Sequence, residues 1–346
     1  MRTIPLSLLL VLSVGGALAG CSSPGAGRPT ASLPAAPSRP AGAVYRLWQD
    51  ASIFTAVRRM LASAGPGQPV WVEMYEFDRP DLEADLESAR DRGADVRLVL
   101  DQTVAETART ARRLEAVGVP VRAYPVDQRR HQIDHVKLLL VGGDGLAGGM
   151  NWGRTSARNH DYAIETRLPT ALDALRAIFL YDWSLAAGRP GGAPSPADGP
   201  VFETTPGTSI RTALLKAIRG ARHAIVAEVY VLTDREVIAG LEAAAGRGVR
   251  VRVVLDRDEE SVNAAGFESL TAHGVEARWY PTSGGGKLHA KSALFDGDRL
   301  LVGSANWSYD GLSVNHELDL LVDDHEAAAA YADRFRRDWT ASDTSL

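Results

Sequence analysis

Two stretches of this chain repeat one another at a nearly constant separation. The segment GVPVRAYP that begins at Gly118 returns as GVEARWYP at Gly274, 156 residues later, and Gly93 has its counterpart at Gly248, 155 residues later. Each glycine follows a helical pattern and precedes an apolar run, which is typical of a helix that ends before a strand. The 346 residues are therefore expected to contain two copies of one folding unit.

The order of elements within each copy predicts an α/β fold. In the first copy the periodicity predicts helices at 51–64, 81–92 and 107–117 and strands at 69–77, 95–101 and 119–124. In the second copy it predicts helices at 209–219 and 234–245 and strands at 224–232 and 249–256. This alternation favours a central sheet in each half. We expect the halves to span 44–187 and 201–346, with a linker rich in Gly and Pro at 188–200.

A histidine and a lysine two residues apart are the most informative polar pair in the second copy. If residues 288–295 form a strand, His289 and Lys291 project from one face, because alternate side chains of a strand share a face. Asp296 and the glycine after it suit the φ > 0 positions of a tight hairpin turn. The segment 299–302 is then the returning strand.

The returning strand ends in Gly-Ser-Ala-Asn, which brings Ser304 and Asn306 back beside the His-Lys pair. An imidazole with a near-neutral pKa, a fixed cation and two hydrogen-bond donors suit a phosphate diester. The histidine can attack phosphorus or protonate a leaving oxygen, and the lysine can hold the charged oxygens. The pattern predicts phosphodiester chemistry, and the alternative is an ordinary hairpin with a surface histidine and lysine.

The first copy carries the same residues with three departures. His135, Lys137 and Asn151 stand at the matching positions. Gly142 occupies the position of the motif aspartate, Gly149 replaces the motif serine, and the segment is one residue shorter. Because Gly and Asp both form turns, we expect this copy of the site to survive.

The spacing His-x-Lys, four residues, Asp, six residues, Gly-Ser-x-Asn resembles the HKD signature of the phospholipase D superfamily. The resemblance covers most of residues 44–340. It implies two pseudo-twofold-related halves, each a phospholipase D-like α/β/α sandwich, with the active site at their interface. It also implies a covalent phosphohistidine intermediate, no metal ion or other cofactor, and a monomer that is sufficient for activity.

The resemblance also implies roles for individual residues. His135 and His289 would stand on either side of the phosphate. The remaining implied site residues are Lys137, Lys291, Asn151, Asn306, Asp296 and Ser304. The N-terminal histidine is often the nucleophile in such two-copy proteins, which gives the hypothesis that His135 attacks and His289 is the general acid. The sequence leaves the reverse assignment open.

An acidic residue follows each motif asparagine at a similar distance. Asn159-His160-Asp161 matches Asn315-His316-Glu317. In the superfamily an acidic residue near this position hydrogen-bonds a catalytic histidine and sets its tautomer, in the manner of a catalytic triad. By resemblance Glu317 fills that role, and Asp161 is a shorter substitute with less reach. The alternative is a pair of strand-edge charges, and both histidines are predicted to be structural or surface residues.

The N-terminus has the features of an export signal. A basic residue precedes an apolar stretch at 5–17, and residues 18–21 read Leu-Ala-Gly-Cys, which resembles the lipobox of bacterial lipoproteins. Cys21 is the only cysteine. We therefore expect a lipoprotein signal peptide at 1–20, a lipidated Cys21 and a disordered tether at 21–43, which would anchor the protein to the extracytoplasmic side of the bacterial membrane. The alternative is a plain secretory signal with an incidental cysteine.

The leading functional prediction is a phospholipase D-like phosphodiesterase that hydrolyses or transphosphatidylates phospholipid head groups. A metal-independent endonuclease of the same superfamily is an alternative, although a formal charge of −5 argues against non-specific coating of nucleic acid. A cardiolipin-synthase-like transferase is less favoured, because such proteins usually carry transmembrane helices near the start. A catalytically weakened binding module is the non-enzymatic alternative, suggested by Gly142 and Gly149.

Overall fold

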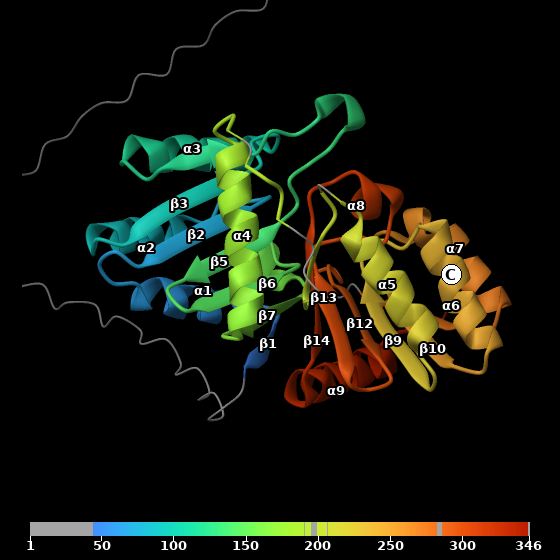
Figure 1. The fold of residues 1–346 in the computed structure, drawn as a ribbon. Coiled ribbons are helices and arrows are strands. Elements are labelled where there is room, and N and C mark those ends of the chain that lie inside the picture. The colour runs from blue at the N-terminus through green and yellow to red at the C-terminus, as the bar shows by residue number, and fades with distance from the viewer. Residues whose placement is uncertain (1–43, 190, 195–198, 206, 282–285, 345–346) are drawn as a thin grey trace, which may run out of the picture. The chain divides into compact units, whose positions relative to one another are not determined.

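The computed structural model describes residues 44–189, 191–194, 199–205, 207–281 and 286–344 (Figure 1). All of them belong to one compact unit. The predicted signal peptide, Cys21 and the predicted tether lie outside the described residues, as does part of the predicted linker. Within the described part of the chain, no helix is both long enough and apolar enough to cross a membrane.

Helices and strands alternate through the first half, as the sequence predicts. Its elements are β1 (Tyr45–Gln49), α1 (Ser52–Ser63), β2 (Pro69–Met74), α2 (Pro80–Asp91), β3 (Asp95–Leu100), α3 (Ala105–Ala116), β4 (Val121–Ala123), the 3₁₀ turn η1 (Gln128–Arg130), β5 (Lys137–Val141), β6 (Asp144–Gly148), the 3₁₀ turn η2 (Ser156–Arg158), β7 (Tyr162–Thr166) and α4 (Pro169–Leu185).

The second half repeats this series. Its elements are β8 (Val201–Glu203), α5 (Ser209–Gly220), β9 (Ala224–Val229), α6 (Arg235–Gly246), β10 (Arg250–Asp256), α7 (Glu260–Ala272), β11 (Glu276–Tyr280), β12 (Lys291–Phe295), β13 (Arg299–Gly303), α8 (Tyr309–Ser313), β14 (Leu318–Asp323) and α9 (His325–Ala341).

Each half contains one seven-stranded mixed sheet, and the two sheets share one topology. The first has the order β1-β7-β6-β5-β2-β3-β4, and the second, from the matching edge, has the order β8-β14-β13-β12-β9-β10-β11. In both sheets three parallel strands adjoin an antiparallel set, and the boundary lies at the pairs β2–β5 and β9–β12. The predicted duplication and its α/β class are confirmed.

Helices cover both faces of each sheet, because the strands at the centre are apolar on both sides. On β5, Leu138 and Leu140 pack in the same cluster as α4, whereas Leu139 and Val141 pack with α1, α2 and α3 on the other face. The cluster that includes α4 also includes residues of α9 from the second half. The two halves therefore share this hydrophobic cluster, and each half also has a cluster of its own.

Two local predictions need correction. The strand predicted over 288–295 begins at Lys291, so His289 lies in the segment just before β12. The helix α7 was not predicted because its buried positions include Asn263 and Gly266, which hide the apolar stripe. Gly266 is required there, since a Cβ would come within 2.8 Å of a backbone carbonyl oxygen of Leu232.

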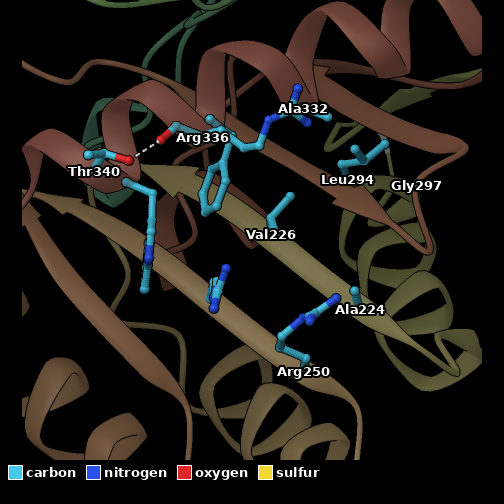
Figure 2. Close-up of a pocket in the computed structure, with 11 residues that line it drawn as sticks. Ala224, Val226, Arg250, Leu294, Gly297, Ala332, Arg336 and Thr340 are labelled. Atoms are coloured by element: carbon cyan, nitrogen blue, oxygen red, sulfur yellow. Dashed lines mark hydrogen bonds between the residues drawn. The ribbon is translucent and has the colours of Figure 1, made fainter.

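One difference between the halves leaves a cavity in the second. In the first half Trp71 stacks on Phe179 of α4 at 5.2 Å between ring centroids. Val226 stands at the matching position 155 residues later, and a cavity of about 440 Å³ opens beside it, between β9 and α9 (Figure 2). Arg250 and Gly297 also line the cavity, at the ends of the strands away from Lys291. The cavity is thus separate from the His-Lys pairs.

Candidate active site

Both His-Lys pairs lie at equivalent places in the two sheets. Lys137 begins β5 beside the end of β2, and Lys291 begins β12 beside the end of β9. Each lysine Nζ donates a hydrogen bond to the backbone carbonyl of its own motif histidine, His135 or His289. All four residues are buried, with no more than 6% of any of them exposed. Lys291 lies close enough to His135, and Lys137 close enough to His289, to lower the pKa of the opposite histidine, so the structure brings together the two pairs that the sequence singled out.

Two tyrosines complete this cluster and were not predicted. Tyr75 follows β2 and packs edge-on against the ring of His135 at 4.8 Å, while Tyr230 follows β9 and packs against His289 at 5.0 Å. Each ring also lies 5.1 Å from the ammonium of the motif lysine in its half. The sequence signal was present, because both tyrosines end an apolar strand and lie 155 residues apart.

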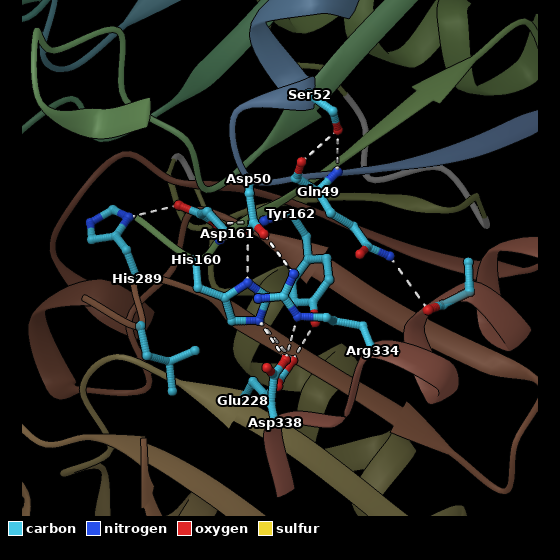
Figure 3. A network of polar contacts seen from close by, with 12 residues as sticks. Gln49, Asp50, Ser52, His160, Asp161, Tyr162, Glu228, His289, Arg334 and Asp338 are labelled. Carbon is cyan, nitrogen blue, oxygen red and sulfur yellow. Dashed lines mark hydrogen bonds and ion pairs between the residues drawn. The ribbon is translucent and has the colours of Figure 1, made fainter. Parts of the chain in front are cut away.

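Each motif histidine is held by a carboxylate from the opposite half. His135 Nδ1 lies 2.8 Å from Glu317 Oε2, and His289 Nδ1 lies 2.8 Å from Asp161 Oδ2, a contact drawn in Figure 3. The shorter aspartate thus reaches its histidine as closely as the glutamate does. Because Nδ1 of each ring points to a carboxylate, that nitrogen carries the hydrogen and Nε2 is left for chemistry.

The change from serine to glycine in the first copy is explained by the aspartate. A Cβ on Gly149 would lie 2.2 Å from Asp161 Oδ1, so glycine alone gives this carboxylate room. In the second copy the Ser304 hydroxyl accepts a hydrogen bond from the backbone N–H of Leu318 and lies beside the longer Glu317. The departure at position 149 is therefore coupled to Asp161, whose carboxylate lies where a serine Cβ would be.

The motif asparagines have unused hydrogen-bonding capacity. Asn151 Nδ2 donates to Glu76 Oε2 at 3.0 Å. The Oδ1 atoms of Asn151 and Asn306 are buried and have no hydrogen-bond partner within the described ranges. The tryptophans that follow them, Trp152 and Trp307, are buried and belong to the hydrophobic cores.

Asp296 was expected among the catalytic residues, and the structure places it elsewhere. It lies in the turn after β12, at the opposite end of that strand from Lys291, with a φ of 53°. Its carboxylate accepts hydrogen bonds from the backbone N–H groups of Arg222, His223 and Ala224, the closest at 2.7 Å. The motif aspartate therefore anchors a turn, and Gly142 in the first copy removes that anchor without removing a group from the histidine-lysine cluster.

Substitution Asp296→Ala should lower stability and leave turnover nearly intact. Loss of the acceptor for three backbone N–H groups should cost about 1–3 kcal/mol in the free energy of unfolding. Denaturant unfolding and kcat measured on the same preparation test this, with Asp298→Ala in the same exposed turn as the matched control. A hundredfold loss of kcat at unchanged stability would show that Asp296 takes part in the reaction.

Burial governs the charge of the lysines and carboxylates. Desolvation lowers the pKa of Lys137 to about 7 and that of Lys291 to about 8, although the opposing carboxylates limit the shift. Desolvation likewise raises the pKa of Asp161 to about 7 and that of Glu317 to about 8, with the lysines acting in the opposite direction. The four groups therefore depend on one another for their charge.

The motif histidines are neutral in the free protein. Desolvation, with repulsion from Lys137 and Lys291, holds the pKa of both His135 and His289 well below 6.5. A neutral ring with its Nδ1–H on a carboxylate presents an Nε2 lone pair. A phosphate anion bound between the rings would favour protonation of one of them.

The lysine pKa values predict an alkaline limit to activity. As the pH rises through about 7 to 8, the ammonium groups of free Lys137 and Lys291 lose their charge and can no longer attract a phosphate. We expect kcat/KM to fall over this range and kcat to fall at higher pH, because bound anion stabilises the ammonium. Initial rates across the range, with circular dichroism to exclude unfolding, test this. A kcat/KM that stays constant to about pH 10 would contradict it.

Some buried histidines and carboxylates lie close enough together to hold a metal ion. Glu73, Asp134 and His316 form one such group, and His160, Glu228 and Asp338 form another. In both groups the histidine nitrogens contact carboxylate oxygens directly. We therefore interpret them as ion-pair clusters that join the halves, and the His-Lys cluster contains no such ligand set among the described residues.

Known proteins are similar to both halves of the chain. A family model described as "Cardiolipin synthase, PLD-like domain" matches residues 57–183 and again 214–339. A probable cardiolipin synthase YwiE of Bacillus subtilis (strain 168) is 25% identical over 312 residues, which cover 79% of this chain and 62% of that protein. The mitochondrial cardiolipin hydrolase of Canis lupus familiaris is 30% identical over 151 residues, which cover 43% and 59% of the two chains. The chain thus spans less than two thirds of these relatives.

Solved structures agree in fold. Phosphatidylserine synthase of Haemophilus influenzae Rd KW20 has a TM-score of 0.70 at 11% identity, over 85% of this chain and 86% of that one. Polyphosphate kinase of Porphyromonas gingivalis has a TM-score of 0.65 at 16% identity, over 86% and 47%. With the duplicated sheets and both family matches in place, the chain belongs to the PLD-like domain family of the cardiolipin synthase type and contains two copies of that domain.

Proposed function

We propose that the protein is a phosphodiesterase of the phospholipase D type that acts on phospholipid head groups through a covalent phosphohistidine. The observation that carries this proposal is the crossed arrangement of the two motif histidines. Each Nδ1 is fixed by a carboxylate of the opposite half, at 2.8 Å in both cases. Two imidazoles oriented in this way supply a nucleophile and a proton donor for displacement at one phosphorus.

In the first step of the proposed mechanism, Nε2 of His135 attacks the phosphorus of the diester. The bond from phosphorus to the head-group oxygen breaks, and protonated His289 gives its Nε2 proton to that leaving oxygen. In the second step a water or alcohol molecule loses its proton to His289 and attacks phosphorus. The phosphorus–nitrogen bond then breaks, which frees His135 and releases the phosphatidic acid or the new diester.

The remaining side chains hold charge in this mechanism. Lys137 and Lys291 would neutralise the non-bridging phosphate oxygens, and their burial makes each contact stronger than it would be in water. The Nδ2 group of Asn306, and the Nδ2 hydrogen of Asn151 that is not on Glu76, would donate hydrogen bonds to the same oxygens. Because the cations and amides are already in place, the site needs little reorganisation when charge develops.

The relatives support a phospholipid as the substrate. Those named above are a probable cardiolipin synthase and a cardiolipin hydrolase, so the same kind of domain serves transfer and hydrolysis. For this chain we propose a phosphatidyl group as the transferred group, with either water or a lipid alcohol as acceptor. The sequence disfavoured a cardiolipin-synthase-like transferase, and we now propose to test water and a lipid alcohol as acceptors side by side.

To test this proposal, one preparation of the protein is assayed on several phosphodiesters in the presence of excess EDTA. The full chain, with His289→Ala as control, is incubated with phosphatidylglycerol vesicles, with and without ethanol, and separately with single- and double-stranded DNA. Cardiolipin, phosphatidylethanol or released head group, absent with the variant, would support the proposal. DNA cleavage without lipid turnover would move the assignment to the endonuclease alternative. No turnover of either substrate by folded protein would favour the binding module.

Membrane attachment through Cys21 is a separate proposal. Its basis is the lipobox-like sequence, since residue 21 lies outside the described residues. Expression in a bacterial host with labelled palmitate should label the wild-type protein, and Cys21→Ser should remove the label because the acylated thiol is gone. Ser22→Ala is the matched control and should stay labelled. Label that persists on Cys21→Ser would refute lipidation at this residue.

A further inference from the structure

The histidine that precedes each orienting carboxylate is buried against the opposite half of the protein. His160 precedes Asp161 and is 3% exposed, and His316 precedes Glu317 and is fully buried. They lie 156 residues apart, at matching positions of the repeat. Neither has a part in the proposed mechanism, and both differ from ordinary core histidines in the number of carboxylates around them.

His160 is enclosed by carboxylates from both halves (Figure 3). Its Nδ1 lies 2.6 Å from Asp50 Oδ1. Its Nε2 lies 3.2 Å from Asp338 Oδ2 and 3.5 Å from Glu228 Oε2, and both of these acids belong to the second half. The ring of Tyr280, also from the second half, stacks on the imidazole at 5.5 Å.

One further cation balances this cluster. Arg334 of α9 forms ion pairs of 2.6 Å with both Asp50 and Asp338, and the Tyr162 hydroxyl donates to Glu228. Although burial opposes protonation, the surrounding carboxylates raise the pKa of His160 well above 6.5. The ring is therefore a buried cation that links the first half to acids of the second.

His316 has an equivalent environment, with the acids that contact its Nε2 supplied by the first half. Its Nε2 lies 3.1 Å from Asp182 Oδ2 and 3.5 Å from Glu73 Oε1, both from the first half, and its Nδ1 lies 2.7 Å from Thr205 Oγ1. Tyr124 stacks on the ring at 4.6 Å between centroids. The other acids that face it are Asp134 and Glu203. The carboxylates raise its pKa well above 6.5 against the effect of burial.

The backbone of His160 is joined to the segment that carries the motif histidine of the second half. Its N–H donates to the Lys287 carbonyl at 2.9 Å, and its carbonyl accepts from the His289 N–H at 2.8 Å. The next side chain, Asp161, holds the ring of His289. Displacement of His160 would therefore move both the backbone and the ring partner of His289.

His316 is joined in the same way to the motif segment of the first half. Its N–H donates to the Ile133 carbonyl at 2.9 Å, and its carbonyl accepts from the His135 N–H at 2.8 Å. Glu317, the next residue, holds the His135 ring. The two connections are equivalent, and each runs from one half into the other.

We propose that His160 and His316 are positioning residues. Each is held by carboxylates of the opposite half and fixes the position of the residue that follows it. His160 thereby helps Asp161 to orient His289, and His316 helps Glu317 to orient His135. This inference rests on the proposed function for its effect on turnover. Its structural part is that His160 controls the ring of His289 and His316 controls the ring of His135. This part does not depend on the identity of the substrate. A displacement of about 1 Å at such a site can cost about a hundredfold in rate.

The test combines turnover with the state of each ring. His160→Gln and His316→Gln are prepared in the full chain with ¹⁵N-labelled histidine. His273→Gln is the matched control, since His273 also contacts a carboxylate, Glu242 at 3.4 Å, but is exposed and lies away from the site. Ring ¹⁵N shifts report the tautomer and titration of His135 and His289 without any substrate, so this readout remains valid if phospholipid turnover is not found.

A crossed pattern is expected. His160→Gln should disturb the tautomer and titration of His289 and leave His135 as in the wild type, whereas His316→Gln should do the reverse. Each should lower kcat by about 10- to 100-fold with KM changed less than about twofold, because positioning is lost while the phosphate ligands stay. The His273→Gln control should change neither ring nor kcat.

Other patterns would overturn the proposal. Unchanged rings in both folded variants would show that His160 and His316 only fill space, and equal disturbance of both rings by each variant would show a general loosening. If the glutamine variants fail to fold, Asp338→Asn and Asp182→Asn weaken the same two contacts while both histidines remain. The same crossed ring pattern in that pair would support the proposal, and its absence would overturn it.

Discussion

Substitution of either His135 or His289 by asparagine should lower the hydrolysis or transfer of a natural phospholipid by about 10³-fold or more. An alcohol head group is a poor leaving group, so loss of the nucleophile and loss of the proton donor are both severe. Because the two rings act in one displacement in the proposed mechanism, the double variant should be little slower than either single variant. Initial rates on phosphatidylglycerol vesicles provide the measurement.

An activated substrate distinguishes the role of nucleophile from that of general acid for the two histidines. A p-nitrophenyl ester of phosphatidic acid has a leaving group with a pKa of about 7, which departs without an acid. If His289 is the acid, the first-turnover burst of p-nitrophenol from His289→Asn should recover to within about tenfold of the wild-type rate, while that of His135→Asn stays about 10³-fold slower. Steady-state turnover of His289→Asn should stay slow, because the second step still needs His289 as the base. Recovery of His135→Asn instead would reverse the roles, and full activity of either variant on the natural lipid would contradict the mechanism.

The sequence carried enough information to predict the duplication and the two His-Lys pairs. Repeats near 155 residues and the alternation of helices and strands are local signals, and the matching topology of the two sheets confirms the fold that they implied. The hairpin at Asp296 was also predictable, because Asp-Gly is a local turn signal and its φ values of 53° and 86° are those of such a turn.

What could not be predicted was which half serves which histidine. Asp161 follows His135 in the first half but orients His289 in the second, and Glu317 does the reverse. Sequence order carries no information on such crossed contacts, since they depend on how the halves pack. The place of Asp296 was not predictable for a related reason, because spacing in a motif does not distinguish a turn anchor from a group beside the histidine-lysine cluster.

The crossed contacts make a prediction opposite to that from sequence proximity. Glu317→Gln and Asp161→Asn should each lower kcat on a natural phospholipid by about 10²- to 10³-fold, because an amide no longer stabilises an imidazolium or enforces one tautomer. These changes keep side-chain size, so KM and stability should change less than kcat. Their effects should differ on the activated ester according to the histidine that each residue holds.

Glu317→Gln should behave like a variant of His135, although it lies in the second half, and should stay slow on the p-nitrophenyl ester. Asp161→Asn should behave like a variant of His289 and should recover most of its rate of p-nitrophenol release in the first turnover. Pairing each carboxylate variant with each histidine variant extends the test, since Glu317→Gln should add little to His135→Asn. If Glu317→Gln instead showed the same rates as His289→Asn, each half would be acting alone. The shared site described here would then not be the site that converts the substrate.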